Sequence, residues 1–175
     1  MSASRACRML VPRPLTAASF APFGDVIEAA GEAIAINYGA TSRFHDLARL
    51  DAADAGGHAI VSIFRSTPPA YPFTLQVMEN HPLGSQAFYP LGGRGYLVVV
   101  APAGPFDPER LEAFIAGSHQ GVNYRKGVWH HYNLALGSVS DFLVIDRAGP
   151  GDNLEEIRLA PFAPVGIAPP ACGGF

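Results

Sequence analysis

Short runs of β-branched, aromatic and aliphatic residues alternate along the chain with clusters of Gly, Pro and Asp. Runs of about four to eight such residues, bounded by turn-forming residues, are typical of β-strands. They predict strands at residues 25–29, 43–50, 59–65, 73–79, 86–91, 96–102 and 141–146. Many short strands with few helices indicate a barrel or a sandwich in a single domain.

Two segments break this pattern and are predicted to be helical. The first, at residues 15–24, has Thr16 as an N-cap. The second begins at Asp107, which is followed by a proline at the first helical position, and ends at Gly117. Its apolar face is formed by Leu111, Phe114 and Ile115. We expect this helix to pack on the outside of the sheet.

Composition narrows the class of protein. The chain has 175 residues and a net charge of −3, and its basic residues form no stripe of the kind that nucleic-acid binders carry. The apolar run at 96–101 is far shorter than the about 20 residues of a membrane-spanning helix. Cys7 and Cys172 show no zinc-site spacing, which predicts reduced thiols in a cytoplasmic protein.

The chain is predicted to divide into a catalytic domain and a tail. Residues 1–159 form the single catalytic domain in this interpretation. Residues 160–175 are rich in Ala, Pro and Gly and carry no charge. They predict an extended arm that is ordered only where it docks on the barrel or on a neighbouring subunit.

A polar group interrupts the apolar strand at 73–79. Glu79 and His81 are two residues apart, so in an extended strand they share one face with Leu75 and Val77. That face is therefore the buried one, where an unpaired charge is costly. A Pro-Leu-Gly turn then brings Gln86 close. The group predicts a functional site, and the alternative is a hydrogen-bonded network that closes the turn.

The spacing of this group resembles the first metal-binding motif of the cupins. Glu79, His81, Gln86 and Gly93 stand at the motif positions. Glu79 replaces an imidazole, and Gln86 replaces a carboxylate with a weaker neutral ligand. A divalent metal such as Ni²⁺, held by Glu79, His81, Gln86 and His130, therefore stays an open alternative to a metal-free acid–base site.

The segment 119–131 resembles the second cupin motif. Gly127 and His130 match that motif, and Arg125 stands where it has a proline. Adjacent side chains of an extended segment point to opposite faces, so His130 and His131 cannot both point inward. We assign His130 to the interior. Together the two motifs predict a mainly β, cupin-type barrel (a double-stranded β-helix or jelly roll) with one or two peripheral helices.

Beyond the cupin pattern, the chain resembles the ureidoglycolate lyase family. The resemblance is carried by residues 23–27, 36–39, 43–47, 81–88, 121–124, 127–131, 140–144 and 146–147. Tyr132 and Asn133 depart from the Pro-Leu pair expected there. The resemblance implies a homodimer that cleaves (S)-ureidoglycolate to glyoxylate and urea in allantoin and purine breakdown, with metal stimulation in some members.

The elimination that the resemblance implies needs a base, a proton donor and a cation for the substrate carboxylate. We hypothesise His81 or His130 as the base, with Glu79 orienting it or sharing the proton. We hypothesise Arg43 or Arg125 as the carboxylate clamp, since the guanidinium fork matches a carboxylate. Further candidate contacts to the substrate are Ser85, Gln86, Asn123 and Tyr124.

Two rival functions stay open at this point. One is a metal-dependent cupin of another kind, such as a dioxygenase or a sugar isomerase, which bound metal without lyase activity would indicate. The other is a non-enzymatic cupin that binds a small carboxylate without turning it over.

Overall fold

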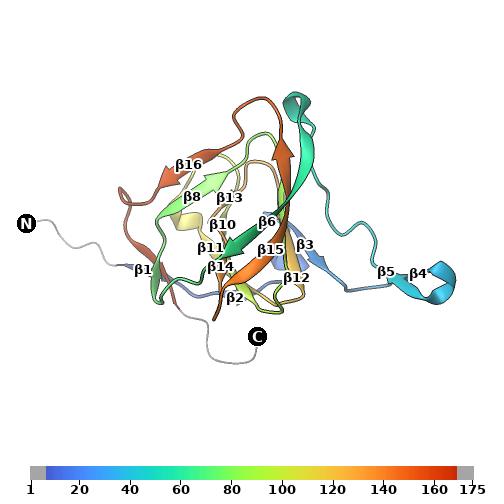
Figure 1. Cartoon of the computed structure of the whole chain (residues 1–175). Helices are drawn as coiled ribbons and strands as arrows, with labels where there is room; N and C mark the ends of the chain where they lie inside the picture. Colours follow the sequence, from blue (N-terminus) through green and yellow to red (C-terminus); the bar gives the residue numbers. More distant parts are fainter. Residues whose placement is uncertain (1–6, 169–175) are drawn as a thin grey trace, which may run out of the picture.

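The computed structural model describes residues 7–168, which fold mainly into β-strands (Figure 1). The strands of the first half are β1 (Arg8–Leu10), β2 (Arg13–Pro14), β3 (Gly24–Glu28), β4 (Ile34–Ile36), β5 (Thr41–Arg43), β6 (His58–Ser66), β7 (Phe73–Thr74), β8 (Val77–Asn80) and β9 (Gln86–Pro90). Those of the second half are β10 (Tyr96–Ala101), β11 (Glu112–Ala116), β12 (Gln120–Tyr124), β13 (Trp129–His130), β14 (Leu134–Ala135), β15 (Ser140–Ala148), β16 (Glu155–Arg158) and β17 (Val165–Ile167). The helical elements are α1 (Ala17–Phe20), η1 (Asn37–Gly39), η2 (Asp54–Gly56) and η3 (Pro108–Arg110).

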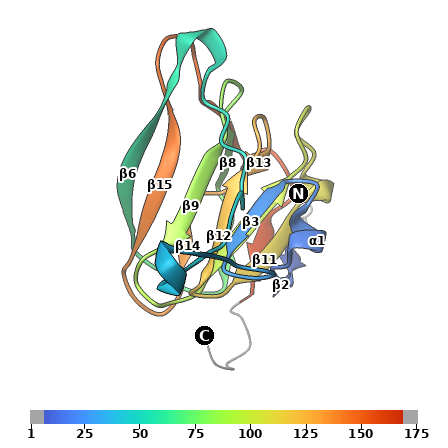
Figure 2. The same cartoon turned by 90° about the vertical axis from the view of Figure 1, so that its right-hand side faces the viewer.

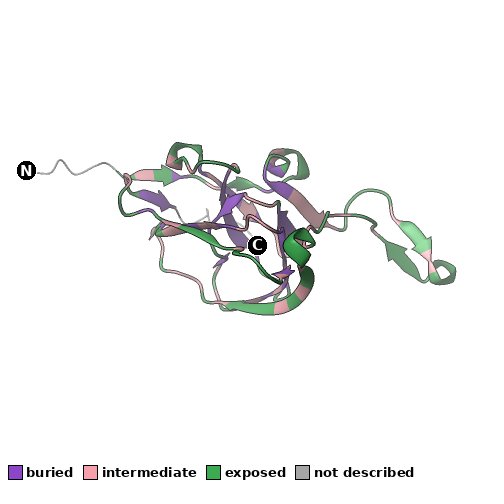
Figure 3. Cartoon of the chain, turned by 90° about the horizontal axis from the view of Figure 1, so that it is seen from above, coloured by how far each residue is buried: buried purple, intermediate pink, exposed green. Residues whose placement is uncertain are grey.

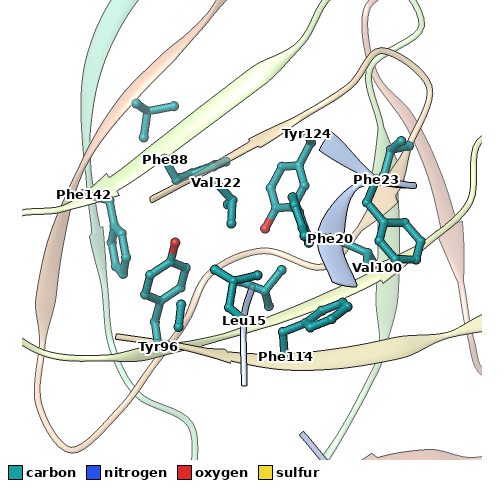
Figure 4. Packing of buried hydrophobic residues seen from close by; sticks show 14 residues of the cluster. Leu15, Phe20, Phe23, Phe88, Tyr96, Val100, Phe114, Val122, Tyr124 and Phe142 are labelled. Atoms are coloured by element: carbon teal, nitrogen blue, oxygen red, sulfur yellow. The ribbon is translucent and has the colours of Figure 1, made fainter. Parts of the chain in front are cut away.

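Two sheets face each other across the core. One has the strand order β16-β8-β13-β10-β11-β2, and the other has the order β3-β12-β9-β15-β6 (Figures 1 and 2). Tyr96 and Val100 point from β10 into the space between them, where Phe88 and Phe142 meet them from the second sheet (Figure 4). Val98 belongs to the same cluster. This architecture confirms the mainly β, cupin-type prediction.

Strand β10 is buried on both faces, which explains its unbroken apolar sequence. Its outward side chains Leu97 and Val99 pack in a second cluster with Met78 and Ile167. Ile167 belongs to a small sheet of order β1-β17-β7. The first part of the predicted tail thus packs on the body, while residues 169–175, with Cys172, lie outside the described residues. The predicted boundary at residue 159 stays a prediction.

Of the two predicted helices, the first is confirmed and the second is wrong. Thr16 caps α1 by accepting a hydrogen bond from the backbone of Ser19. Asp107 caps only the single turn η3, and the chain then enters β11. Strand β11 pairs along its whole length with β10, with Phe114 opposite Val98. Pairing with a strand that is buried on both faces outweighs a local helical preference.

Two predicted strands are also corrected. Of the strand predicted at 43–50, only Arg43 is in a strand, and it ends β5. The strand predicted at 73–79 splits into β7 and β8, because the backbone of Leu75 bonds to Val165 in the small sheet. Leu75 consequently joins the second cluster with Met78 and does not share the face of Glu79.

The β4–β5 hairpin projects away from the two sheets (Figures 1 and 3). Its side chains are exposed or half-buried throughout, and Tyr38 at its tip is fully exposed. Asn37 and Tyr38 turn the chain there with positive φ angles. Within residues 7–168, no helix has both the length and the apolar character that crossing a membrane requires.

Candidate active site

Glu79, His81 and His130 converge in the interior between the two sheets. Glu79 on β8 lies directly opposite His130 on β13 in the antiparallel register. His81 follows β8 by one residue, and its carbonyl accepts a hydrogen bond of 2.9 Å from the backbone of Gly127. This hydrogen bond connects the first cupin-like motif, which contains His81, with the second, which contains Gly127. One ligand atom from each of the three side chains lies within 4.8 Å of the others.

Gln86 completes this group from the opposite sheet. Its Oε1 lies 3.2 Å from Nε2 of His81 and 3.1 Å from Nε2 of His130. We call Glu79, His81, Gln86 and His130 the polar cluster. Tyr124 stacks on the ring of His130, with the ring centroids 4.3 Å apart, and shields it from water.

The far side of each imidazole faces a backbone carbonyl. Nδ1 of His81 lies 2.7 Å from the carbonyl oxygen of Asn153, and Nδ1 of His130 lies 3.2 Å from that of Val128. A carbonyl can only accept, so the tautomer of each neutral ring with its proton on Nδ1 donates to this carbonyl and turns the Nε2 lone pair toward Gln86. Metal-binding histidines are oriented in the same way. In this tautomer the centre of the polar cluster is surrounded by acceptors, as a cation site requires.

The charge states agree with this picture. The contact with His130, whose Nε2 lies 3.5 Å from Oε1 of Glu79, lowers the pKa of Glu79, and burial opposes this shift without reversing it. Burial lowers the pKa of His130, and this effect outweighs the opposing influence of Glu79. At neutral pH Glu79 is therefore an ionised carboxylate, and His130 beside it is a neutral imidazole. Deprotonated ligands of this kind are what a cation binds.

A cleft of about 240 Å³ leads to Glu79. Its lining residues are Phe64, Arg65, Ser66, Glu79, Phe88, Tyr132 and Asn133. Arg65 is its single basic lining residue, and its guanidinium is bound to Asp141 through contacts of 2.7 and 2.9 Å. No free arginine or lysine among the lining residues is therefore available to a substrate carboxylate.

Comparison with known proteins identifies the relatives of this chain. The family model described as ureidoglycolate lyase matches residues 7–165. A ureidoglycolate lyase of Burkholderia mallei (strain NCTC 10229) is 58% identical over 147 residues, which cover 83% of this chain and 86% of the relative. One of Rhizobium etli (strain CIAT 652) is 52% identical over 82% of this chain and 87% of the relative. One of Brucella melitensis biotype 2 (strain ATCC 23457) is 52% identical over 88% of this chain and 92% of the relative.

The chain belongs to the ureidoglycolate lyase family. This confirms the resemblance inferred from the sequence. All four members of the polar cluster lie inside the matched range. Tyr124 also lies at the cluster, through its stacking on His130, and its predicted contact with the substrate stays a prediction.

Four other residues that the sequence predicted to bind the substrate do not reach the polar cluster. Ser85 and Arg125 line a separate cavity of about 590 Å³. Ser85 accepts a hydrogen bond from the backbone of Asp51 instead. The amide nitrogen of Asn123 donates to Asp25. Arg43 ends β5, at the base of the projecting hairpin (Figure 1).

Sequence reasoning gave no role to two residues that contact the polar cluster. Asp146 lies inside a block that resembles the family, and its Oδ2 is 3.4 Å from Nε2 of Gln86. The alternation along β15 could have indicated that Asp146 faces inward, because Val144 and Phe142, two and four residues earlier, also do. Asn153 contacts His81 from a loop distant in sequence, and no local pattern marks it.

Proposed function

We propose that this chain is a ureidoglycolate lyase that cleaves (S)-ureidoglycolate to glyoxylate and urea. The observation that carries the proposal is the polar cluster at the end of the cleft, in a chain 52–58% identical to proteins named for this activity. The cleft presents the ionised carboxylate of Glu79 to a small polar substrate, and the imidazoles of His81 and His130 lie within 4.8 Å of this carboxylate. These are the group types that proton transfer near neutral pH requires.

We also propose a divalent cation in the polar cluster. Two imidazole nitrogens, a carboxylate oxygen and an amide oxygen converge there, and both Nδ1 atoms are turned to backbone carbonyls. This donor set suits a first-row metal such as Ni²⁺ or Mn²⁺. Glu79, His81 and His130 would hold the ion, with Gln86 as a weaker fourth ligand. When bound, it supplies a positive charge that polarises the substrate oxygens.

The chain's own residues then account for the proton movements. In the elimination, the substrate hydroxyl loses its proton, the carbon–oxygen double bond forms, the carbon–nitrogen bond breaks, and the leaving nitrogen takes up a proton to give urea. Glu79 is ionised and lines the cleft, so it can accept the first proton and return it to the nitrogen. His81 or His130 is the alternative base wherever its Nε2 is free.

Product analysis tests this proposal. The purified full chain is incubated with ureidoglycolate, with and without Ni²⁺ or Mn²⁺, and urea, glyoxylate and ammonia are measured. We expect urea and glyoxylate in equal amounts and no ammonia. Release of ammonia would indicate hydrolysis instead, and absence of all three products under every metal condition would refute the assignment.

We further propose that two copies of the chain associate as a homodimer through the projecting hairpin. Between Glu32 and Arg43 the hairpin carries no charge, and Ile34 and Tyr38 are exposed. An isolated two-stranded hairpin is at best marginally stable in water. A hairpin with this composition is expected to be covered by another surface.

The same side of the molecule offers such a surface. Figure 2 looks onto the sheet β3-β12-β9-β15-β6, with the hairpin directed toward the viewer. On its outer face Val61 pairs with Ile145 and Ile63 with Leu143, and Val61 and Ile63 are exposed. We call this apolar surface the outer sheet face. A two-fold dimer needs one surface that is complementary to a copy of itself. Here the uncharged hairpin of each copy would contact the outer sheet face of the other copy.

The oligomeric state tests the homodimer. Light scattering after size-exclusion chromatography is expected to give twice the chain mass for the wild type. Ile34→Glu and Val61→Glu should each shift the protein to monomer, whereas Val11→Glu, at a still more exposed apolar position elsewhere, should not. A monomeric wild type would contradict the homodimer, as would dimers in both test variants. The low cysteine content, two in 175 residues, supports a cytoplasmic location as part of the proposal.

A further inference from the structure

Asp146 is an inward-facing carboxylate that the proton-transfer scheme does not use. It follows Phe142 and Val144 on the inner face of β15, where both of these neighbours are fully buried. Its Oδ2 lies 3.4 Å from Nε2 of Gln86. Its Oδ1 is buried and has no hydrogen-bond partner among the residues that the structure describes. A carboxylate held in this way calls for a partner of positive character.

The basic residue next to Asp146 does not provide that partner. Arg147 points to the other side of the strand, where its guanidinium donates to the carbonyl oxygens of Asp54 and Pro150 at 2.6 Å each. Within residues 7–168, Asp146 forms no ion pair with a lysine, arginine or histidine. The amide of Gln86 is thus its single hydrogen-bonding side chain in the described part of the chain.

An amide side chain has a donating end and an accepting end, and Asp146 decides which end of Gln86 faces the polar cluster. An ionised carboxylate only accepts, so it holds the amide nitrogen of Gln86 on its own side. The amide oxygen must then face the opposite way, toward the two imidazoles, where it lies 3.2 and 3.1 Å from their Nε2 atoms. A reversed amide would turn an N–H donor toward the centre of the cluster.

We propose that Asp146 is a positioning residue, which keeps Oε1 of Gln86 directed at a divalent cation in the polar cluster. The proposal rests on the cation site given under the proposed function. Asp146 acts through Gln86, in the way that outer partners of metal ligands orient them. Its negative charge, added to that of Glu79, also balances the two positive charges of the ion.

A double-mutant cycle on the metal-free full chain tests this role. The affinity for Ni²⁺ is measured by titration calorimetry for the wild type, Asp146→Asn, Gln86→Glu and the double variant. Asp146→Asn presents both a donor and an acceptor, so the amide of Gln86 is free to reverse. We expect Ni²⁺ to bind about 10- to 100-fold more weakly in this variant.

The effect of Asp146→Asn in the Gln86→Glu variant distinguishes a positioning role from a purely structural one. A carboxylate has equivalent ends and needs no orientation. Asp146→Asn should therefore cause no loss of Ni²⁺ affinity when Gln86→Glu is already present. Equal losses in the two backgrounds, or an affinity of Asp146→Asn within about twofold of wild type, would overturn the positioning role alone. A wild type that binds no Ni²⁺ would overturn the cation site and this proposal together.

Matched controls exclude a general loss of structure. Asp141→Asn removes a carboxylate from the same strand, where it binds the exposed Arg65, and should leave the Ni²⁺ affinity unchanged. Thermal unfolding of each variant without metal shows whether it is folded. Should Asp146→Asn fail to fold, Asp146→Ser replaces it in the cycle, since a hydroxyl also donates and accepts.

Discussion

Two hollows of the molecule contain residues that the sequence predicted for catalysis or substrate binding, and they differ in how their polar groups are satisfied. The larger, of about 590 Å³, contains Ser85 and Arg125. There Lys126 lies 2.5 Å from Asp54 and 3.3 Å from Asp51, and these hydrogen bonds raise its pKa. Arg125 pairs with Asp25. The basic groups of this cavity therefore already have partners.

The smaller cleft, of about 240 Å³, leads to the polar cluster, where partners are missing. When both imidazoles carry their protons on Nδ1, four acceptors meet there without a donor between them. Asn133 Nδ2 and Asp146 Oδ1, at the cleft and beside the cluster, are buried without a hydrogen bond in the described part of the chain. Buried polar atoms are usually paired, so unpaired ones indicate a missing ligand. Asn123, which bonds to Asp25 of the larger cavity, also has a buried oxygen without a partner among the described residues. The convergence of a carboxylate and two imidazoles, and not volume, therefore distinguishes the smaller cleft as the candidate site.

Removing an imidazole of the polar cluster should have the largest effect. We expect His81→Ala and His130→Ala each to lower kcat about 10²- to 10⁴-fold, the usual contribution of a proton-transferring group or ligand. Initial rates of glyoxylate formation measure this loss, and circular dichroism checks the fold. Near-normal turnover in both variants would mean that the cluster is only a structural network.

The burial of His131, the residue that follows His130, should also make the protein sensitive to acid. Burial lowers the pKa of His131 to about 4, below its unfolded value of about 6.5. The unfolded chain therefore binds the proton more readily between these values. Stability should fall as the pH drops from 6.5 to 4, by up to about 3 kcal/mol from this group.

Urea denaturation at pH 7 and pH 5 measures this effect. His131→Phe should reduce the difference in unfolding free energy between the two values, while His58→Phe, at an exposed position, should leave it unchanged. An unaltered pH dependence in His131→Phe would contradict the assignment of a buried neutral ring.

Metal binding should stabilise the fold through the polar cluster alone. A ligand at about 100 times its Kd adds about 2.7 kcal/mol, which for a chain of this size raises Tm by roughly 5–10 °C. Differential scanning calorimetry with Ni²⁺ and then a chelator follows the rise and its reversal. A rise of the same size in His130→Ala would place the ion elsewhere.

Changes in the larger cavity should have the smallest effect. Surface ion pairs contribute about 0–1 kcal/mol, and Arg125 and Lys126 are both partly exposed. Arg125→Gln and Lys126→Gln should keep kcat/KM within about threefold of wild type. A loss of a hundredfold or more would move the substrate carboxylate into this cavity.

The sequence predicted the features that depend on local alternation and spacing. The cap at Thr16, the inward direction of His130 and the approach of Gln86 to His81 all follow from residues that are near one another in the chain. Strand β11 could not be predicted in this way. Asp107 does begin a helical turn, but pairing of Phe114 with β10 decides the conformation beyond it.

The parts of the candidate site that the sequence missed come from distant segments. Asn153 bonds to His81 across a long stretch of chain, and Asp146 meets Gln86 only because β15 pairs with β9. Arg43 and Arg125 were predicted from their charge. Charge type alone does not place a side chain, and neither arginine reaches the polar cluster within this chain.

Crystals of the full chain grown with Ni²⁺ and glyoxylate would test the central claim most directly. Anomalous scattering at the nickel edge locates the ion without assumptions about the ligands. We predict a single strong peak between Glu79, His81, Gln86 and His130, with glyoxylate beside it in the cleft. Nickel or glyoxylate bound instead among Asp25, Arg125 and Lys126, with the polar cluster empty, would contradict the account.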